Sequence, residues 1–189
     1  MATPAVPLIE REDVVGEAAV TYDRVAATRG RMGNVFKALA NSPGALDRVA
    51  ALGEFVRFES GLGDELREAL ILTVAAERSC VYEWTHHWHL AERAGMSAER
   101  LAVMGTGAAE DEPAPIGPAV RLARSIARTG DAPAELVGDL RNRLGDRALV
   151  ELVATVGYYT LLAGVINSLD VPLEEDVEPI ELPDGRTAT

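Results

Sequence analysis

The side chains best suited to chemistry gather in one short segment, Cys80-Val81-Tyr82-Glu83-Trp84-Thr85-His86-His87-Trp88-His89. It holds all three histidines of the chain, its only cysteine and both tryptophans. On an α-helix, residues three and four apart share a face, so Cys80, Glu83 and His87 form one stripe. A carboxylate one turn from an imidazole can hold its tautomer, raise its basicity or share a proton with it. The stripe predicts an acid–base site, with a partly exposed, salt-bridged face as the alternative.

Two further stripes share this helix. Trp84 and Trp88 lie on one of them, which indicates packing in the core or against another subunit, because large aromatic side chains bury well. Tyr82, His86 and His89 lie on the other, which is more typical of a half-exposed surface than of a site. We place Tyr82, Trp84 and His86 among the residues that line the pocket of the candidate site.

The preceding helix adds a carboxylate, Glu68, on a face otherwise completed by Ile71, Leu72 and Ala75. A carboxyl group on an apolar face is either buried with a partner or tuned for proton transfer. Glu68 is therefore a candidate catalytic residue, and a structural ion pair with an arginine is the alternative.

A metal site is the main competitor, because Glu83 and His87 with His86 or His89 have ligand-like spacing. His86 and His89 point to a different face from His87, however, so one helix cannot present all of them to a single ion. We expect no metal. The sequence also shows no nucleophile elbow and no glycine-rich phosphate loop.

The totals limit the other function classes. With 189 residues the chain predicts one domain, and its net charge of −12 disfavours nucleic acid and anionic membranes as partners. One cysteine cannot form an intramolecular disulfide. The first thirty residues show no signal-peptide pattern, and the longest apolar run, 149–169, is interrupted by Glu151, two glycines and Asn167. The cytoplasm is the expected compartment.

Helical spacing of apolar residues recurs along the chain, and no stretch alternates as a strand does. Asn34, Ser42 and Ser97 are expected N-caps, Pro43 a first helical residue, and Gly95 a left-handed helix end. We expect a loop over 105–118. The expected helices cover 13–28, 35–40, a segment from Pro43 to about 56, 64–77, 80–94, a short segment after Ser97, 118–128, 133–144 and 146–169.

The segment 80–97 resembles the carboxymuconolactone decarboxylase family, which includes the alkylhydroperoxidase D-like proteins. Residues 33–43, the Leu66-Arg67-Glu68 start of a central helix and the stretch 151–159 with Asn167 match the family in the same order. The resemblance implies an all-α, single-domain helical bundle of the alkylhydroperoxidase D-like type over 30–170. Residues 1–29 would add an extension and a first helix, and 171–189 an acidic C-terminal arm.

The resemblance also assigns roles. In the peroxidase branch the motif is Cys-x-x-Cys-x-x-x-His with an upstream glutamate, which correspond here to Cys80, His87 and Glu68. Glu83 stands at the second cysteine, so the chain has no resolving thiol of its own. The decarboxylase branch uses no metal or organic cofactor, and a glutamate and a histidine suit it better.

Three functions follow from these residues. The preferred one is a cofactor-free lyase or isomerase acting on a small lactone or carboxylated ring compound, with Glu83 orienting His87 and Glu68 tuning the pair. The alternatives are a thiol peroxidase that uses Cys80 with an external thiol, and a non-catalytic binding or assembly protein.

The helix over 149–169 is apolar on nearly all sides, and the tryptophan stripe needs cover as well. Both indicate a homo-oligomer, and the resemblance implies a trimer or a hexamer built from trimers. The arm from Val171 is expected to run over the surface of its own subunit or of a neighbour.

Overall fold

Helices make up the secondary structure of this protein. The computed structural model describes residues 3–185, and within that range it contains eight α-helices and no strand, so the predicted all-α fold is confirmed. The helices are α1 (Gly16–Arg29), α2 (Asn34–Leu39), α3 (Pro43–Glu54), α4 (Asp64–Glu77), α5 (Val81–Arg93), α6 (Ala98–Val103), α7 (Ile116–Thr129) and α8 (Ala134–Ser168). Short 3-10 turns span Arg11–Asp13 and Gly107–Asp111, and a π-helical turn, Phe55–Glu59, follows α3.

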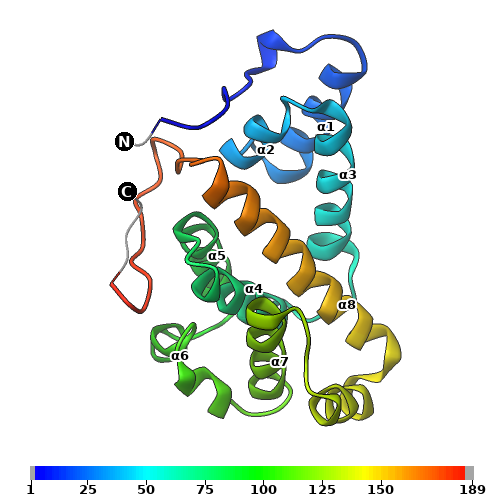
Figure 1. Cartoon of the computed structure of the whole chain (residues 1–189), viewed down its shortest axis with the longest axis vertical. Coiled ribbons are helices and arrows are strands. Elements are labelled where there is room, and N and C mark those ends of the chain that lie inside the picture. The colour runs from blue at the N-terminus through cyan, green and yellow to red at the C-terminus, as the bar shows by residue number, and fades with distance from the viewer. Residues whose placement is uncertain (1–2, 186–189) are drawn as a thin grey trace.

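Helix α4 lies at the centre and contacts α5, α7 and α8 (Figure 1). Its residues 68–75 are all buried, so every face of the helix meets another part of the protein. Glu68 is among them, together with the apolar residues that follow it. A carboxylate in this position needs a partner, because burying an unpaired charge is costly.

Several helix ends follow from local sequence. Pro43 begins α3, Gly95 has φ 103°, and the Ser97 hydroxyl accepts a hydrogen bond from the Arg100 N–H at 3.4 Å, all as predicted. The expected cap at Asn34 is wrong, because Gly33 is the N-cap residue of α2. Ser42 is the N-cap residue of α3 as predicted, although its side chain makes no capping hydrogen bond. Asn34 is already helical, and its amide instead donates to the Pro172 carbonyl at 3.1 Å.

The loop expected over 105–118 is partly helical. It includes the 3-10 turn Gly107–Asp111, and α7 begins at Ile116. Pro118 therefore lies within the first turn of α7, where its missing N–H costs no hydrogen bond.

Helix α8 joins two of the expected helices, which meet at Gly145 with the non-helical angles φ 82° and ψ 168°. By length and composition alone α8 is apolar enough to cross a membrane, and half of its most apolar stretch is buried inside the fold. The single chain does not bury the apolar part of α8 on all sides. Val150, Val153 and Leu161 are 67%, 40% and 45% exposed, because the other helices cover only part of its circumference.

The C-terminal arm, residues 171–185 of the part described, folds back onto its own chain over α5 (Figure 1). The Trp84 indole donates to the Glu181 carbonyl at 3.0 Å, and the Ile180 N–H donates to the Thr85 hydroxyl at 3.1 Å. The arm thus covers Trp84, a role that the sequence had left to another subunit or to the core. Residues 186–189 of the predicted arm, and residues 1–2, lie outside the described range.

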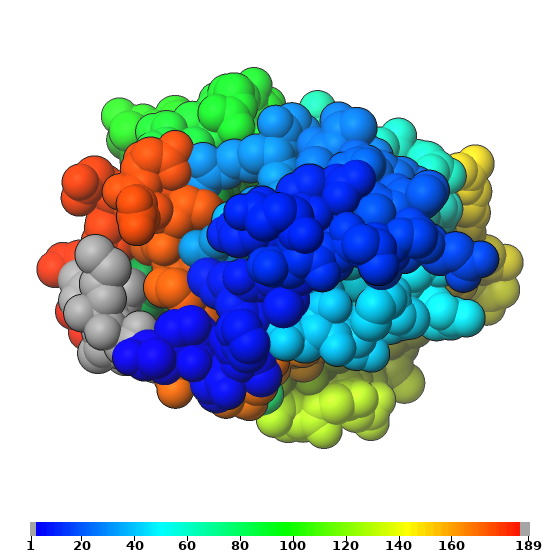
Figure 2. Space-filling view, turned by 90° about the horizontal axis from the view of Figure 1, so that it is seen from above, coloured from blue at the N-terminus to red at the C-terminus, as the bar shows by residue number. Residues whose placement is uncertain are grey.

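The N-terminal segment crosses the same end of the molecule. Figure 2 shows it in dark blue beside the orange start of the C-terminal arm. The Ala5 N–H donates to the Leu169 carbonyl at 2.8 Å, and the Ile9 N–H to the Lys37 carbonyl at 3.2 Å. Both ends of the described chain therefore help to hold α2 and the end of α8 in place.

Candidate active site

The packing of α4 against α5 brings three ionisable side chains together. His87 Nδ1 lies 2.6 Å from Glu68 Oε2, and His87 Nε2 lies 3.3 Å from Glu83 Oε2. The exposed fractions are 2% for Glu68 and 4% each for Glu83 and His87. We call these three residues the Glu–His–Glu cluster. An imidazole between two buried carboxylates can hold a proton and pass it to either side.

The cluster differs from the expected arrangement in one respect. Glu83 was expected to orient His87, with Glu68 acting on the pair from the next helix, yet Glu68 makes the shorter contact. Arg67 Nε lies 3.5 Å from Glu68 Oε1, so the arginine pair considered as an alternative coexists with the histidine contact. Spacing along α5 reveals only the partners within that helix, and the Glu68 contact depends on how the two helices pack.

The electrostatics of the cluster favour a charged imidazole. Burial lowers the pKa of His87, but the charge and hydrogen bond of Glu68, together with Glu83, outweigh it and raise that pKa above its ordinary value. Burial raises the pKa of Glu68, but His87, with Arg67 and Arg57, holds it below its ordinary value. The pair therefore retains a proton on His87 in the pH range where a free histidine begins to lose one.

Cys80 does not join the cluster at the pocket. Its side chain is completely buried within the main apolar core, and it is not among the residues that line the pocket. Burial, with the charge of Glu83, raises the pKa of the thiol well above its ordinary value. The structure thus places Cys80 in the core and not in the pocket wall that Glu83 and His87 help to form. Cys80 precedes the first residue of α5 and has φ −97° and ψ 90°, so helical spacing does not govern its direction.

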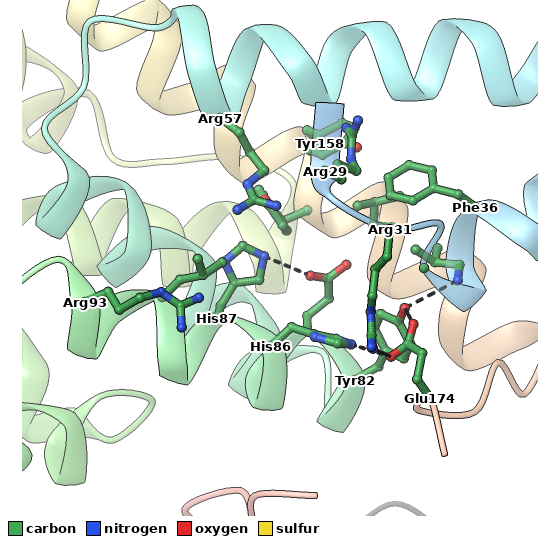
Figure 3. A pocket seen from close by; sticks show the side chains of 16 residues that line it. Arg29, Arg31, Phe36, Arg57, Tyr82, His86, His87, Arg93, Tyr158 and Glu174 are labelled. Carbon is green, nitrogen blue, oxygen red and sulfur yellow. Dashed lines mark hydrogen bonds and ion pairs between the residues drawn. The ribbon is translucent and has the colours of Figure 1, made fainter. Parts of the chain in front are cut away.

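A pocket of about 340 Å³ opens beside the cluster (Figure 3). Glu83 and His87 form part of its wall, and Glu68 lies behind His87. Tyr82 and His86 line it as predicted. Its walls also contain residues that the sequence did not single out, namely Arg29, Arg31, Gly33, Val35, Phe36, Arg57, Leu90, Arg93, Tyr158, Tyr159, Leu162 and Glu174.

Glu174 of the C-terminal arm closes one side of this pocket. It accepts hydrogen bonds from the Tyr82 hydroxyl at 2.7 Å and the Asn34 N–H at 2.8 Å, and lies 2.8 Å from His86 Nε2. Burial raises the pKa of Glu174, but these contacts outweigh it and lower the pKa to about 2. Its importance was missed because it is one of several acidic residues in the arm, and no local pattern distinguishes it.

Trp84 lies away from the pocket, which corrects its place among the expected lining residues. It is 1% exposed and belongs to a second apolar core with Leu72, Leu101 and Leu182. Trp88 packs against it with ring centroids 5.5 Å apart. The two tryptophans therefore pack in the core, as one of the two interpretations of their stripe predicted.

Within residues 3–185, no group of three or more histidine, cysteine, aspartate or glutamate side chains is arranged to hold a metal ion. His89, the remaining histidine, is exposed and lies 3.1 Å from Glu92. Metal-free and cofactor-free chemistry stays a prediction.

Comparison with known proteins gives a family for part of the chain. The model of the carboxymuconolactone decarboxylase family matches residues 43–128, which include Glu68, Cys80, Glu83 and His87. No curated protein matches the sequence.

Solved structures share the fold over nearly the whole chain. A peroxidase-related protein from Ralstonia eutropha JMP134, described as an alkylhydroperoxidase AhpD core, is 15% identical with a TM-score of 0.78, over 93% of this chain and 95% of its own. A peroxidase-related protein from Silicibacter sp. TM1040 is 17% identical with a TM-score of 0.76, over 92% and 93%. The debrominase Bmp8, solved as a cysteine-to-alanine variant with 2,3,4-tribromopyrrole, is 16% identical with a TM-score of 0.70, over 93% and 94%. At these identities the likeness shows the fold alone.

Proposed function

We propose that this chain, whose residues 43–128 match the carboxymuconolactone decarboxylase family and whose fold is shared by AhpD-like structures, is a cofactor-free lyase or isomerase. Its substrate would be a small lactone or a carboxylated ring compound, and the chemistry would be acid–base catalysis. The observation that supports this most directly is His87, held between two buried carboxylates at the wall of a pocket of about 340 Å³. Such a pocket suits a small molecule.

The cluster supplies what a decarboxylation needs. Loss of CO₂ breaks a carbon–carbon bond and leaves an electron pair on the ring, which must be delocalised and then protonated. His87 and Glu83 face the pocket, so they are the groups that deliver or remove that proton. Glu68 contacts the other imidazole nitrogen, where it holds the ring in place and offsets the charge of the imidazolium. In this assignment Glu68 is a positioning residue.

The thiol peroxidase alternative finds less support. A peroxidatic cysteine reacts as the thiolate, and Cys80 is fully buried with a raised pKa. The chain contains no second cysteine that could resolve an oxidised one. Buried charges cost stability. A protein that only binds or assembles has no need of the Glu–His–Glu cluster, whereas an acid–base enzyme does.

Turnover of a γ-lactone that carries a carboxylate tests the proposal, with release of CO₂ as the readout. Glu83→Gln and His87→Ala should each lower turnover by roughly 10²–10⁴-fold, the range for a positioned acid or base. The double variant should cost little more than the worse single one, because groups that act as one unit are not additive. His89→Ala is the matched control, since it removes an exposed histidine from the same helix.

Two results would contradict the proposal. One is full activity in Glu83→Gln or His87→Ala. The other is hydroperoxide reduction, without any lactone turnover, that is lost in Cys80→Ser while the variant remains folded. That second outcome would make the thiol the reactive group.

A further inference from the structure

The pocket wall is more basic than the rest of the protein. Four arginines line it against two glutamates, in a chain whose net charge is −12. A chain that is acidic overall repels anions in solution, so a local excess of positive charge is where an anion would be held. Only an arginine without a carboxylate partner in the protein is free to hold one.

Two of the four arginines already have partners. Arg29 lies 3.4 Å from a carboxylate oxygen of Glu54, and Arg31 lies 3.2 Å from one of Glu174 and 2.8 Å from one of Asp176. Arg57 and Arg93 differ from them. Among residues 3–185, no aspartate or glutamate oxygen comes within 4.0 Å of either guanidinium.

The fold directs both of these arginines toward His87. Arg57 lies in the π-helical turn Phe55–Glu59, which is closed by a hydrogen bond from the Ser60 N–H to the Phe55 carbonyl at 2.8 Å. Turns of this kind are frequent at functional sites. Arg93 is the last residue of α5. In Figure 3 the two side chains flank His87, on the side of the pocket away from Glu174.

We propose that Arg57 and Arg93 form a carboxylate-binding subsite that holds the anionic group of the substrate while its ring lies against Glu83 and His87. Each guanidinium presents paired N–H donors that match the two oxygens of a carboxylate. The identity of the ring compound rests on the proposed function, whereas the binding of its carboxylate does not. The two arginines come from different elements, so together they fix the orientation of the ligand as well as its charge.

Binding to the full-length chain, measured by calorimetry, separates charge recognition from turnover. The probes are γ-butyrolactone bearing one carboxylate and the neutral carboxamide of the same compound, which has nearly the same shape. The carboxylate should bind about tenfold more tightly than the amide, and each of Arg57→Gln and Arg93→Gln should remove about that factor. Binding of the amide should not change.

Arg121→Gln is the matched control. Arg121 is exposed, lies outside the pocket, and donates to the Glu110 backbone carbonyl instead of to a carboxylate. This variant should bind the carboxylate as the unmodified protein does. Circular dichroism of each variant shows whether its helices are intact.

The outcomes distinguish this inference from the proposed function. Carboxylate binding that depends on Arg57 and Arg93 supports the subsite, even if no lactone is turned over. Equal binding of carboxylate and amide, no binding of the carboxylate at millimolar concentration, or arginine variants that bind like Arg121→Gln would overturn the subsite, whatever the activity.

Discussion

Replacing Glu68 with glutamine removes one charge from the Glu–His–Glu cluster and leaves its shape nearly unchanged. Glu68 is 2% exposed, and its Oε2 lies 2.6 Å from His87 Nδ1. The pKa of His87 is raised, so its contribution to stability is complete below its ordinary value of 6.5 and is lost as the pH rises through the folded pKa. The pKa of Glu68 is lowered, so its contribution is complete above 4.5 and is lost as the pH falls through the folded pKa.

Both contributions are therefore complete between pH 4.5 and 6.5. A hydrogen bond to a charged group contributes about 1.5–3 kcal/mol, so Glu68→Gln should lower the free energy of unfolding by about 2 kcal/mol within this window. The difference from the unmodified protein should shrink toward lower pH and toward alkaline pH. Urea unfolding followed by tryptophan fluorescence measures it, because both tryptophans lie on α5, the helix that carries Glu83 and His87.

Glu92→Gln provides the control for this experiment. Glu92 is 3.1 Å from His89 on the same helix, but both side chains are about half exposed. An exposed pair of this kind contributes little, so the variant should unfold like the unmodified protein. If Glu68→Gln and Glu92→Gln cost the same, or if the loss in Glu68→Gln does not vary with pH, the reasoning about the buried pair is refuted.

Four further predictions follow from the site and the fold. Cys80→Ser should leave lactone turnover largely intact, since the thiol lies in the core, and loss of turnover in a folded variant would make Cys80 catalytic. Glu174→Gln should destabilise the protein by up to about 3 kcal/mol at neutral pH, because the pKa of Glu174 is lowered from 4.5 to about 2. The contribution of Glu174 to stability is complete above pH 4.5 and is lost as the pH falls toward 2. If Glu174→Gln destabilised the protein as much at pH 2 as at neutral pH, this prediction would be contradicted. Elemental analysis of active protein should find no stoichiometric zinc, iron or manganese, and one tightly held ion per subunit would overturn the metal-free assignment. Light scattering after gel filtration should show a homo-oligomer, because Val150, Val153 and Leu161 are exposed apolar side chains, and the family resemblance favours a trimer or hexamer over a dimer. An active 20.1 kDa monomer would refute it.

The fold could be predicted because its signals are local. Apolar residues at helical spacing give the helices, while Pro43, Gly95 and Ser97 mark helix ends through their own backbone or side-chain chemistry. Errors arose where local signals compete. Asn34 has the side chain of an N-cap, but its amide is engaged by the C-terminal arm from 138 residues away.

The candidate site was only partly predictable for the same reason. Glu83 and His87 are four residues apart on one helix, so spacing alone pairs them. The contact with Glu68 depends on how α4 and α5 pack, although the sequence had marked that residue as a carboxylate on an apolar face.

Arg57, Arg93 and Glu174 carry no local signal at all. They come from a turn, a helix end and the C-terminal arm, and only the tertiary fold brings them to one pocket. Cys80 shows the opposite error. Its spacing placed it in the site, but it precedes α5 and its side chain enters the core.

The central claim is that His87, held between Glu68 and Glu83, transfers the proton of the reaction. The most direct test is to react a carboxylated γ-lactone in heavy water and to locate deuterium in the product by nuclear magnetic resonance. The account predicts one deuterium at the position that receives the proton after CO₂ is lost, and a rate that falls by roughly 10²–10⁴-fold in His87→Ala. Undiminished release of CO₂ by folded His87→Ala, with the same deuterium in the product, would contradict it.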